Sequence, residues 1–327
     1  MSILEVKNLN VAFKSDEKSY QALYNVSFNL NEGKTLALVG ESGCGKTLTA
    51  MSILRLLPKN AYVMSGEILY NKMDILKTEH PEKIRGTKIA LIPQDPMTSL
   101  NPLYTVENQL VEVINKNKLF SKADTLKKAK EALDKVKIPN VEEKLKAYPH
   151  ELSGGMKQRV IIAMALACNA EIIIADEPTT ALDVTIQAQI MNLLNTIKRE
   201  LRTSILFISH DLELVGQYCD DIAVMYAGSI VEKAPVKEFF DCTLHPYSIA
   251  LLKTRPRGNA KRLKIIEGQP PSIKDCISGC KFHPRCTSST SESCKKVVPE
   301  QYMSKVSENH MVACHLGDWG RLIGRFD

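Results

Sequence analysis

Apolar residues along the chain gather in short runs of strand length, and stretches with helical spacing or polar turns separate these runs. A polar turn around residues 14–18 lies between the first two runs. Such alternation of strand and helix patterns is typical of an α/β fold with a largely parallel sheet. The predicted strands are residues 3–11, 26–30, 34–39, 88–93, 172–175 and 204–209.

Two segments follow the helical pattern. Residues 46–57 read as a helix that Pro58 stops, because proline cannot continue a helix. Residues 121–136 place apolar side chains at helical spacing among many lysines, within a stretch from 106 to 147 that has no strand pattern. We therefore expect a helical subdomain to interrupt the sheet.

Composition places the chain among ordinary globular proteins, with 44% hydrophobic and 24% charged residues. No apolar run approaches the roughly 18 residues that span a bilayer, and the N-terminus lacks the pattern of a secretory signal. We therefore expect a cytoplasmic setting, in which thiols stay reduced. The net charge of +6 is uneven, because residues 253–327 hold 14 Lys and Arg against 7 Asp and Glu. That balance fits a solvated basic surface or an acidic partner.

Residues 40–47, G-E-S-G-C-G-K-T, match the phosphate-binding loop (P-loop) G-x-x-x-x-G-K-[ST] between a predicted strand and a predicted helix. Glycines let backbone N–H groups approach phosphate oxygens, and the helix points its positive end at them. Lys46 suits the β- and γ-phosphates and the Thr47 hydroxyl suits Mg²⁺. Cys44 sits where the motif is unconstrained, as a passive small residue or as a reactive thiol near the phosphate-binding amides.

A second acidic element, E-I-I-I-A-D-E-P, occupies residues 171–178. An apolar strand that ends in two carboxylates suits a P-loop enzyme. Asp176 would hold Mg²⁺ and Glu177 would polarise the attacking water.

Residues 152–159, L-S-G-G-M-K-Q-R, resemble the signature motif of ATP-binding cassette (ABC) ATPases. The other motifs of that family follow in the expected order. Gln94 resembles the Q-loop glutamine, residues 181–183 (A-L-D) resemble the D-loop, and His210 resembles the switch histidine. The resemblance covers residues 1 to about 250.

The resemblance implies an α/β P-loop NTPase cassette with a RecA-like core, an antiparallel β subdomain and an α-helical subdomain at about 98–165. Two cassettes would stack head to tail, so that Ser153 and nearby backbone N–H groups face the γ-phosphate held by the partner. Glu177 would act as the base, His210 would contact the γ-phosphate, and Gln94 would report occupancy to a membrane subunit. Phe13 would lie under adenine, with Tyr20 as its rival.

These motifs give a defined set of expected site residues. Glu177, His210 and Gln94 are the expected catalytic residues, and Thr47, Gln94 and Asp176 are the expected Mg²⁺ ligands. The expected ATP contacts are Phe13, Gly40, Ser42, Gly43, Cys44, Gly45, Lys46, Thr47, Leu48, Gln94, Ser153, Gly154, Gly155, Asp176 and Asp183.

Further stretches narrow the resemblance to one branch. Met156 replaces the usual signature glutamine, and S-L-N-P (99–102), H-P-Y-S-I-A-L-L (245–252), G-Q-P-P-S (268–272) and G-C-K-F-H-P-R-C (279–286) follow in order. Together they resemble the D-type ATP-binding subunit of dipeptide, oligopeptide or nickel importers. That branch implies pairing with an F-type cassette, two membrane permease subunits, an extracytoplasmic binding protein, and a peripheral location on the cytoplasmic face of the membrane.

The tail is rich in cysteine, and we expect residues 253–327 to form an extension beyond a nucleotide-binding domain at 1–252. Cys280, Cys286, Cys294 and Cys314 have the spacing C-x5-C-x7-C-x19-C, which is not that of common zinc ribbons. Four thiolates suit either zinc or a [4Fe–4S] cluster.

The importer resemblance implies the [4Fe–4S] cluster, with Cys276 as a spare or as a substitute for Cys280. Unliganded thiols remain an alternative, as does zinc with His283, His310 or His315 as replacement ligands.

A second function class is a nucleic-acid ATPase of the repair type with a metal-binding basic tail. It would need basic residues interleaved with aromatics on one face. The tail's aromatics, Phe282, Tyr302, Trp319 and Phe326, are widely spread. We therefore expect no nucleic-acid partner. The residues do not separate peptide cargo from nickel, nor an F-type partner from a second copy of the chain.

Overall fold

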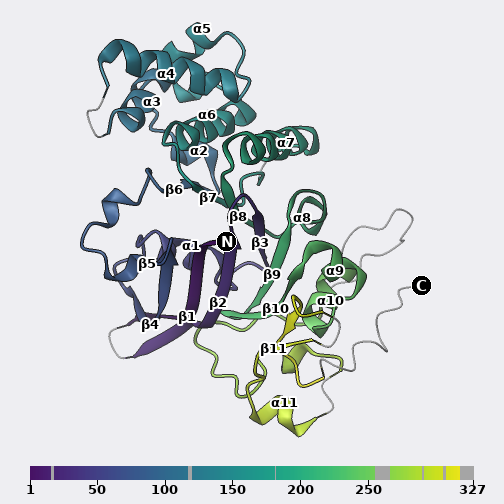
Figure 1. The fold of residues 1–327 in the computed structure, drawn as a ribbon. Helices are drawn as coiled ribbons and strands as arrows, with labels where there is room; N and C mark the ends of the chain where they lie inside the picture. Colours follow the sequence, from purple (N-terminus) through teal and green to yellow (C-terminus); the bar gives the residue numbers. More distant parts are fainter. Residues whose placement is uncertain are drawn as a thin grey trace. The chain divides into compact units, whose positions relative to one another are not determined.

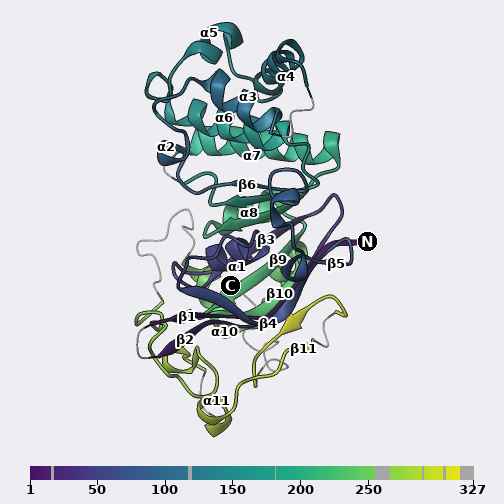
Figure 2. The same ribbon diagram turned by 90° about the vertical axis from the view of Figure 1, so that its left-hand side faces the viewer.

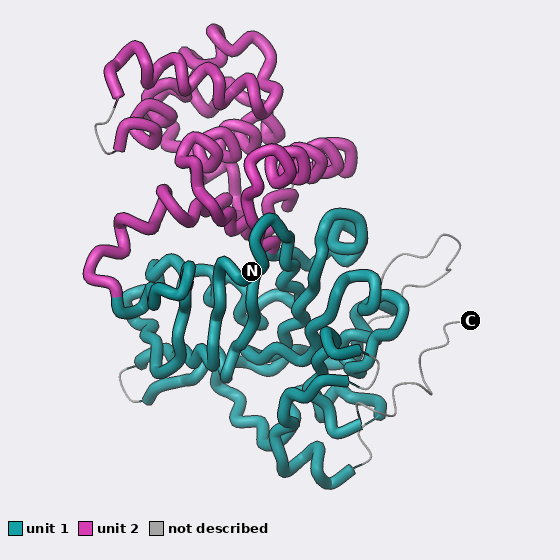
Figure 3. Tube along the Cα trace, in the orientation of Figure 1, with its two compact units in different colours: residues 1–77, 208–327 teal, residues 78–207 magenta. Residues whose placement is uncertain are grey.

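The fold is taken from a computed structural model that describes residues 1–15, 18–116, 120–180, 182–254, 266–288, 291–304 and 307–316. The chain divides into two compact units (Figure 3). Unit 1 comprises residues 1–77 and 208–327, and unit 2 comprises residues 78–207. The tail therefore belongs to the same unit as the first strands. Among the described residues, no helix has the length and apolar character needed to cross a membrane.

Unit 1 contains the antiparallel sheet that the family resemblance implies. Its order is β2-β1-β4-β5, seen side by side in Figure 2. Alternate side chains of β2 are buried from Val26 to Leu30, as expected when one face of a sheet packs on a core, whereas shifts in register interrupt the alternation in β1. The strands are β1 (Ser2–Lys14), β2 (Ser19–Asn31), β4 (Ala61–Tyr70) and β5 (Met73–Asp74).

A second run of strands in unit 1 supports the P-loop. β3 (Thr35–Val39) is buried along its whole length and pairs in parallel with β9 (Asp221–Tyr226). β10 (Ser229–Pro235) turns back antiparallel to β9. Two short strands of the tail, β12 (Met311–Val312) and β11 (Tyr302–Met303), extend the same sheet beyond β10 (Figure 1).

A buried carboxylate fastens the tail to β10. Glu232 has no exposed surface and accepts hydrogen bonds from the backbone N–H groups of Leu244 (2.7 Å) and His245 (3.0 Å). It also contacts Nε2 of the equally buried His310 at 2.8 Å. A buried polar group needs such partners, because a buried donor or acceptor left without a hydrogen bond costs free energy. The contact between Glu232 and His310 thus holds the tail to the sheet.

The helix after the P-loop, α1 (Lys46–Ile53), is shorter than the predicted 46–57. Arg55 has a left-handed backbone with φ 52°, the Leu56 N–H reaches the Met51 carbonyl, and the Arg55 N–H reaches the Ser52 carbonyl. These bonds form a Schellman motif, which ends the helix before Pro58. The other helices of unit 1 are η1 (Ile75–Lys77), α8 (Leu212–Tyr218), α9 (Val236–Asp241), α10 (Pro246–Lys253), η4 (His283–Arg285) and α11 (Glu292–Lys296).

Unit 2 combines short buried strands with a helical layer. β6 (Ile89–Ile92) pairs in parallel with β7 (Ile172–Asp176), and β8 (Ser204–Ser209), whose last two residues belong to unit 1, continues that order. Helices α3 to α6 pack on one another (Figure 1), and α4 confirms the helix predicted over 121–136. The helices are η2 (Pro81–Lys83), α2 (Pro96–Ser99), α3 (Val106–Ile114), α4 (Lys122–Lys135), α5 (Val141–Lys146), η3 (Pro149–Glu151), α6 (Gly154–Ala167) and α7 (Val184–Leu201).

The predicted α/β architecture is confirmed, and every predicted strand is present. Among the parallel partners, β3, β6 and β7 coincide with predicted apolar runs, as expected for strands buried on both faces, whereas β9 was not predicted.

Candidate nucleotide site

The P-loop connects β3 to α1 in unit 1, along a path that only glycine can follow at two points. Gly40 has φ 151°, and a Cβ there would lie 2.2 Å from the backbone oxygen of Met225 in β9. Gly45 has φ 109°, and a Cβ there would lie 2.6 Å from Leu23 Cδ2. The close approach to β9 therefore fixes where the loop begins, and contact with β2 fixes where it ends.

The start of α1 has the features of an anion site. Its N-cap is Gly45, so no side chain caps the first turn, and no acidic residue lies in that turn. The first N–H groups of a helix have no partners within it, and its dipole favours negative charge there. Ser42, Gly43 and Thr47 are exposed beside this helix end, and Leu48 is half-buried. The loop can therefore receive phosphate oxygens.

Lys46 is folded back onto its own loop. Only 5% of the residue is exposed, and Nζ donates to the carbonyl oxygens of Gly40 (2.8 Å) and Glu41 (3.1 Å). Burial raises the pKa of the neighbouring Cys44 thiol, while the Lys46 charge lowers it to a smaller extent. Cys44 is therefore protonated and packed at neutral pH, which favours the passive interpretation of this residue over the reactive one.

In unit 2 the carboxyl end of β7 carries both predicted carboxylates. Asp176 is the last residue of the strand and is 3% exposed. Glu177 follows in a left-handed backbone with φ 47°, an uncommon conformation for a residue other than glycine and one that clusters at functional sites. Its Oε2 accepts hydrogen bonds from Gln94 Nε2 and from Thr180 Oγ1, both at 3.1 Å. The structure thus brings Gln94 and Glu177 into direct contact.

The signature motif opens α6, also in unit 2. Ser153 is exposed and caps the helix, its Oγ accepting the Met156 N–H at 3.3 Å. Gly154 and Gly155 form the first turn, and a Cβ on Gly155 would lie 3.0 Å from Ile186 Cγ2 of α7. Asp183 caps α7 through the Ile186 N–H at 2.9 Å. The signature and D-loop segments therefore pack together, except that Ala181 lies outside the described residues.

His210 and the two adenine candidates belong to unit 1. His210 is exposed and directly follows β8, and Asp211 caps the next helix through the N–H groups of Glu213 and Leu214. Phe13 and Tyr20 are directly opposite each other on β1 and β2, and both are half-buried. The two aromatic rings therefore share one position on the sheet, and both remain candidates for the contact with adenine.

Comparisons with known proteins show which family the chain belongs to. The ABC transporter family model matches residues 23–180, and the model for the C-terminal region of oligopeptide/dipeptide transporters matches residues 231–294. The probable peptide ABC transporter ATP-binding protein y4tR of Sinorhizobium fredii is 45% identical over 95% of this chain and 94% of its own length. The chain belongs to the ATP-binding proteins of peptide ABC transporters. ATP hydrolysis is the activity of this family.

Other relatives agree across nearly the whole length. The dipeptide transport protein DppD of Bacillus subtilis is 46% identical over 97% of this chain and 95% of its own. The oligopeptide transport protein OppD of Escherichia coli is 46% identical over 87% of this chain and 86% of its own. Nothing in these comparisons supports the nucleic-acid alternative.

Solved cassettes share the fold. The dimeric cassette MJ0796, in a post-hydrolysis state with ADP and Pi, superposes with a TM-score of 0.64 at 28% identity, covering 71% of this chain and 98% of that one. The cassette cbiO1 of Clostridium perfringens superposes with a TM-score of 0.64 at 30% identity, covering 73% of this chain and 90% of that one.

The expected Mg²⁺ ligands have the right chemistry for this ABC ATPase. The hydroxyl of Thr47, the side-chain amide oxygen of Gln94 and the carboxylate of Asp176 are oxygen donors, which Mg²⁺ prefers. Mg²⁺ is usually bound by one or two carboxylates plus substrate phosphates rather than by a protein cage. Accordingly, such a site does not need three clustered side chains.

The tail cysteines lie within electrostatic reach of one another. Burial raises the pKa of the Cys280 thiol, and that of Cys314 to about 12, and the neighbouring thiols of Cys286 and Cys294 add to both shifts. However, no group of three or more His, Cys, Asp or Glu side chains in the described residues is arranged to hold a metal ion. The donors therefore suit a cluster, but the described arrangement does not support the predicted [4Fe–4S] site.

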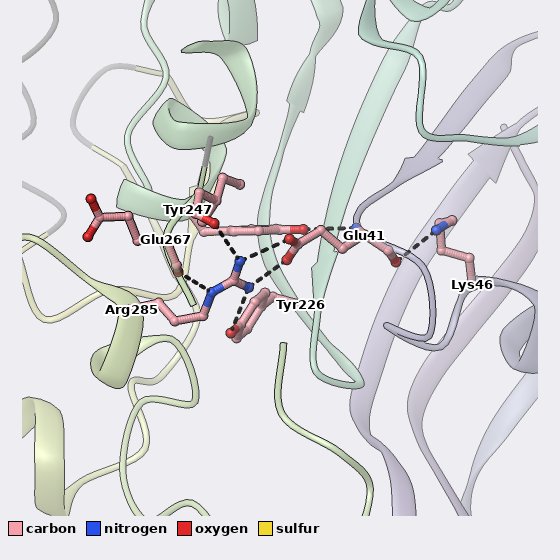
Figure 4. A network of polar contacts seen from close by, with 7 residues as sticks. Glu41, Lys46, Tyr226, Tyr247, Glu267 and Arg285 are labelled. Carbon is pink, nitrogen blue, oxygen red and sulfur yellow. Dashed lines mark hydrogen bonds and ion pairs between the residues drawn. The ribbon is translucent and has the colours of Figure 1, made fainter. Parts of the chain in front are cut away.

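The sequence patterns missed four residues within or beside the P-loop: Glu41, Tyr226, Tyr247 and Arg285 (Figure 4). Glu41 occupies an unconstrained position of the P-loop motif, and Arg285 lies in a stretch that stood out only for its cysteines. No periodicity connects residues so far apart in the chain.

We predict that Gly40→Ala weakens ATP binding by roughly 100-fold, because the new Cβ displaces the loop from the Met225 carbonyl. Equilibrium titration with a fluorescent ATP analogue measures this effect. Gly33→Ala is the matched control, since Gly33 also has a positive φ (67°) but has no atom within 4 Å of the added Cβ. Equal affinity in Gly40→Ala and the wild type contradicts the assignment.

Proposed function

We propose that the chain is the ATP-hydrolysing subunit of a peptide importer, with Glu177 as the base that activates water. The observation that carries the proposal is the Glu177 carboxylate, held in place by Gln94 and Thr180 at the end of β7. Phosphoryl transfer depends mainly on positioning and on stabilisation of charge. A carboxylate whose orientation is fixed by two donors fits that requirement.

The P-loop supplies binding. Backbone N–H groups of residues 40–47 and the start of α1 receive the phosphates, and Lys46 exchanges its two loop carbonyls for phosphate oxygens. Thr47 and Asp176 would hold Mg²⁺, which when bound would neutralise charge on the transferring phosphoryl group. Gln94 donates to Glu177, and its amide oxygen would bind the metal, so it can couple occupancy of the site to the position of the base. His210 contacts the γ-phosphate.

The site is completed by a second cassette. The exposed Ser153 and the first turn of the 14-residue helix α6 present N–H groups and a positive dipole end, which suit a γ-phosphate bound elsewhere. The dimeric state of the similar cassette MJ0796 supports this pairing. We propose an F-type cassette as the partner, so that hydrolysis is tied to opening and closing of a heterodimer.

We infer the chain's role in transport from the family to which it belongs. The relatives are named for oligopeptide and dipeptide transport, and this favours peptide over nickel as cargo. We propose that the chain sits at the cytoplasmic face of the membrane, beneath two permease subunits, and that an extracytoplasmic binding protein delivers the peptide. The chain's own part is to bind ATP, close on its partner and release it after hydrolysis.

The cysteine cluster is a separate proposal. Supporting it are the influence of the neighbouring thiols on the pKa values of Cys280 and Cys314, and the importer resemblance. With their raised pKa values, Cys280 and Cys314 are protonated in the described arrangement, so binding iron requires them to lose protons and draw together. We propose a structural role for the cluster, namely fixing the loops of the tail.

We expect Glu177→Gln to lower kcat for ATP by about 100-fold or more while ATP binding is retained, because the amide cannot accept the proton of water. Phosphate release and nucleotide titration on the same preparation measure the two quantities. Glu171→Gln is the matched control: it lies at the start of the same segment, in an exposed pair with Lys88, and should keep the wild-type rate. Hydrolysis by Glu177→Gln within tenfold of the wild type rules out the assigned base.

Anaerobic purification followed by iron and sulfide analysis tests the cluster. We expect about four iron and four sulfide per chain, lost in Cys294→Ser and kept in Cys276→Ser. Cys294 is buried whereas Cys276 is exposed, so the pair compares an assigned ligand with the spare thiol. Stoichiometric zinc without iron, or an absence of metal, overturns the cluster.

A further inference from the structure

The guanidinium of Arg285, in the tail, binds the side chain of Glu41 in the P-loop (Figure 4). Its Nη1 and Nη2 donate to the two carboxylate oxygens of Glu41 at 2.7 and 3.0 Å, a bidentate ion pair. Nε donates to the Glu267 carbonyl at 2.9 Å, and Tyr226 Oη and the Ile266 carbonyl lie at 3.4 Å. All five donor directions of the guanidinium are therefore directed at acceptors, which is the strong form of arginine recognition.

Because the Arg285–Glu41 pair is buried, breaking it disturbs the structure more than breaking a surface ion pair does. The Arg285 side chain is 5% exposed and that of Glu41 is 25% exposed. Removing one partner of a buried pair leaves the other charge uncompensated and is strongly disruptive. By contrast, an exposed pair such as Lys296 with Glu292, each 73% exposed, contributes little.

The segment that carries Arg285 is anchored at the carboxyl end of β9, the strand beside the P-loop, and on α10. Phe282 is 3% exposed and packs edge-on against Tyr226 of β9, with ring centroids 5.1 Å apart, and against Tyr247 of α10 at 5.3 Å. Lys281 Nζ donates to the Ala227 carbonyl, in the turn after β9, at 2.8 Å. Arg285 is therefore presented to Glu41 from a rigid support rather than from a loose tail.

Glu41 itself is held at three points. Its side chain is bound by Arg285, its backbone N–H donates to the hydroxyl of buried Tyr247 at 2.9 Å, and its carbonyl accepts from Lys46 Nζ at 3.1 Å. The tail therefore holds the Glu41 side chain, α10 holds its N–H group, and Lys46 of the loop itself holds its carbonyl. Displacing the Glu41 side chain therefore moves the carbonyl that positions the phosphate-binding ammonium.

We propose that Arg285 is a positioning residue for ATP binding: through Glu41, the C-terminal segment 281–285 fixes the P-loop and the Lys46 ammonium in the conformation that receives phosphate. This inference rests on the proposed function, because it concerns the same nucleotide site. It assigns to the tail a direct action on the cassette that carries it, whether or not its cysteines hold a metal.

The predicted kinetic signature follows from what a positioned loop does. The P-loop contacts the phosphates in the ground state and in the transition state alike, so loosening it weakens both. Uniform loss of binding raises KM and leaves kcat unchanged. A contact that only stabilises the fold lowers the active fraction instead, which lowers apparent kcat at constant KM.

The experiment is a double-mutant cycle on the full-length chain with Arg285→Gln, Glu41→Gln and the double variant. We expect each single variant to raise KM and the dissociation constant for ATP by roughly tenfold, with kcat within about twofold of the wild type. The double variant should bind ATP no worse than either single variant, because the two residues act as one pair. Arg285→Lys, which keeps the charge but loses the bidentate geometry, should fall in between.

Gln301→Ala is the matched control, since it removes another tail contact, from Nε2 to the Ile230 carbonyl at 3.0 Å, that involves no loop residue. This variant should leave KM and the dissociation constant for ATP unchanged. Unchanged ATP affinity in the single variants, strictly additive losses, or a fall in kcat at constant KM each overturns the inference. If Arg285→Gln does not fold, Glu41→Gln and Arg285→Lys carry the cycle. A folded wild type that does not bind ATP instead refutes the proposed function.

Discussion

The nucleotide site depends on a backbone path that excludes side chains. At Gly40 the chain passes so close to the Met225 carbonyl of β9 that a Cβ would lie 2.2 Å from it, and at Gly45 it turns into α1 through a positive φ. Only this path directs the loop amides and the uncapped helix end towards one point. The strands on which it rests, β3 and β9, are buried parallel partners, so the core of unit 1 and the loop conformation support each other.

Local patterns predicted the parts of the site that are local in sequence. The P-loop and the carboxylates after β7 were predicted because strand ends, helix starts and glycines leave marks in the sequence, whereas the signature at the start of α6 was recognised by its resemblance to a known family. The end of α1 was placed too late, since a left-handed Arg55 rather than a glycine closes the helix, and arginine gives no such signal. The hydrogen bond from Gln94 to Glu177 is a tertiary contact; the family resemblance named both residues but did not predict that they meet.

Long-range pairs could not be predicted in this way. Glu41 and Arg285 are separated by 244 positions and come from a loop motif and a cysteine-rich stretch, neither of which marks a partner. The contact of Glu232 with His310 is likewise invisible in the sequence, because buried polar groups follow no period. Both contacts change the interpretation of the tail, from an appendage identified by its thiols to a segment built into the sheet and the P-loop of unit 1.

The central claim is that ATP hydrolysis by this chain drives peptide import. The most direct measurement is uptake of a labelled oligopeptide into proteoliposomes that contain the complete transporter, with ATP and purified binding protein supplied on their respective sides. We expect peptide accumulation that requires ATP and that is abolished by excess unlabelled peptide but not by nickel. Brisk ATP hydrolysis without peptide accumulation, or ATP-driven uptake of nickel alone, would contradict it.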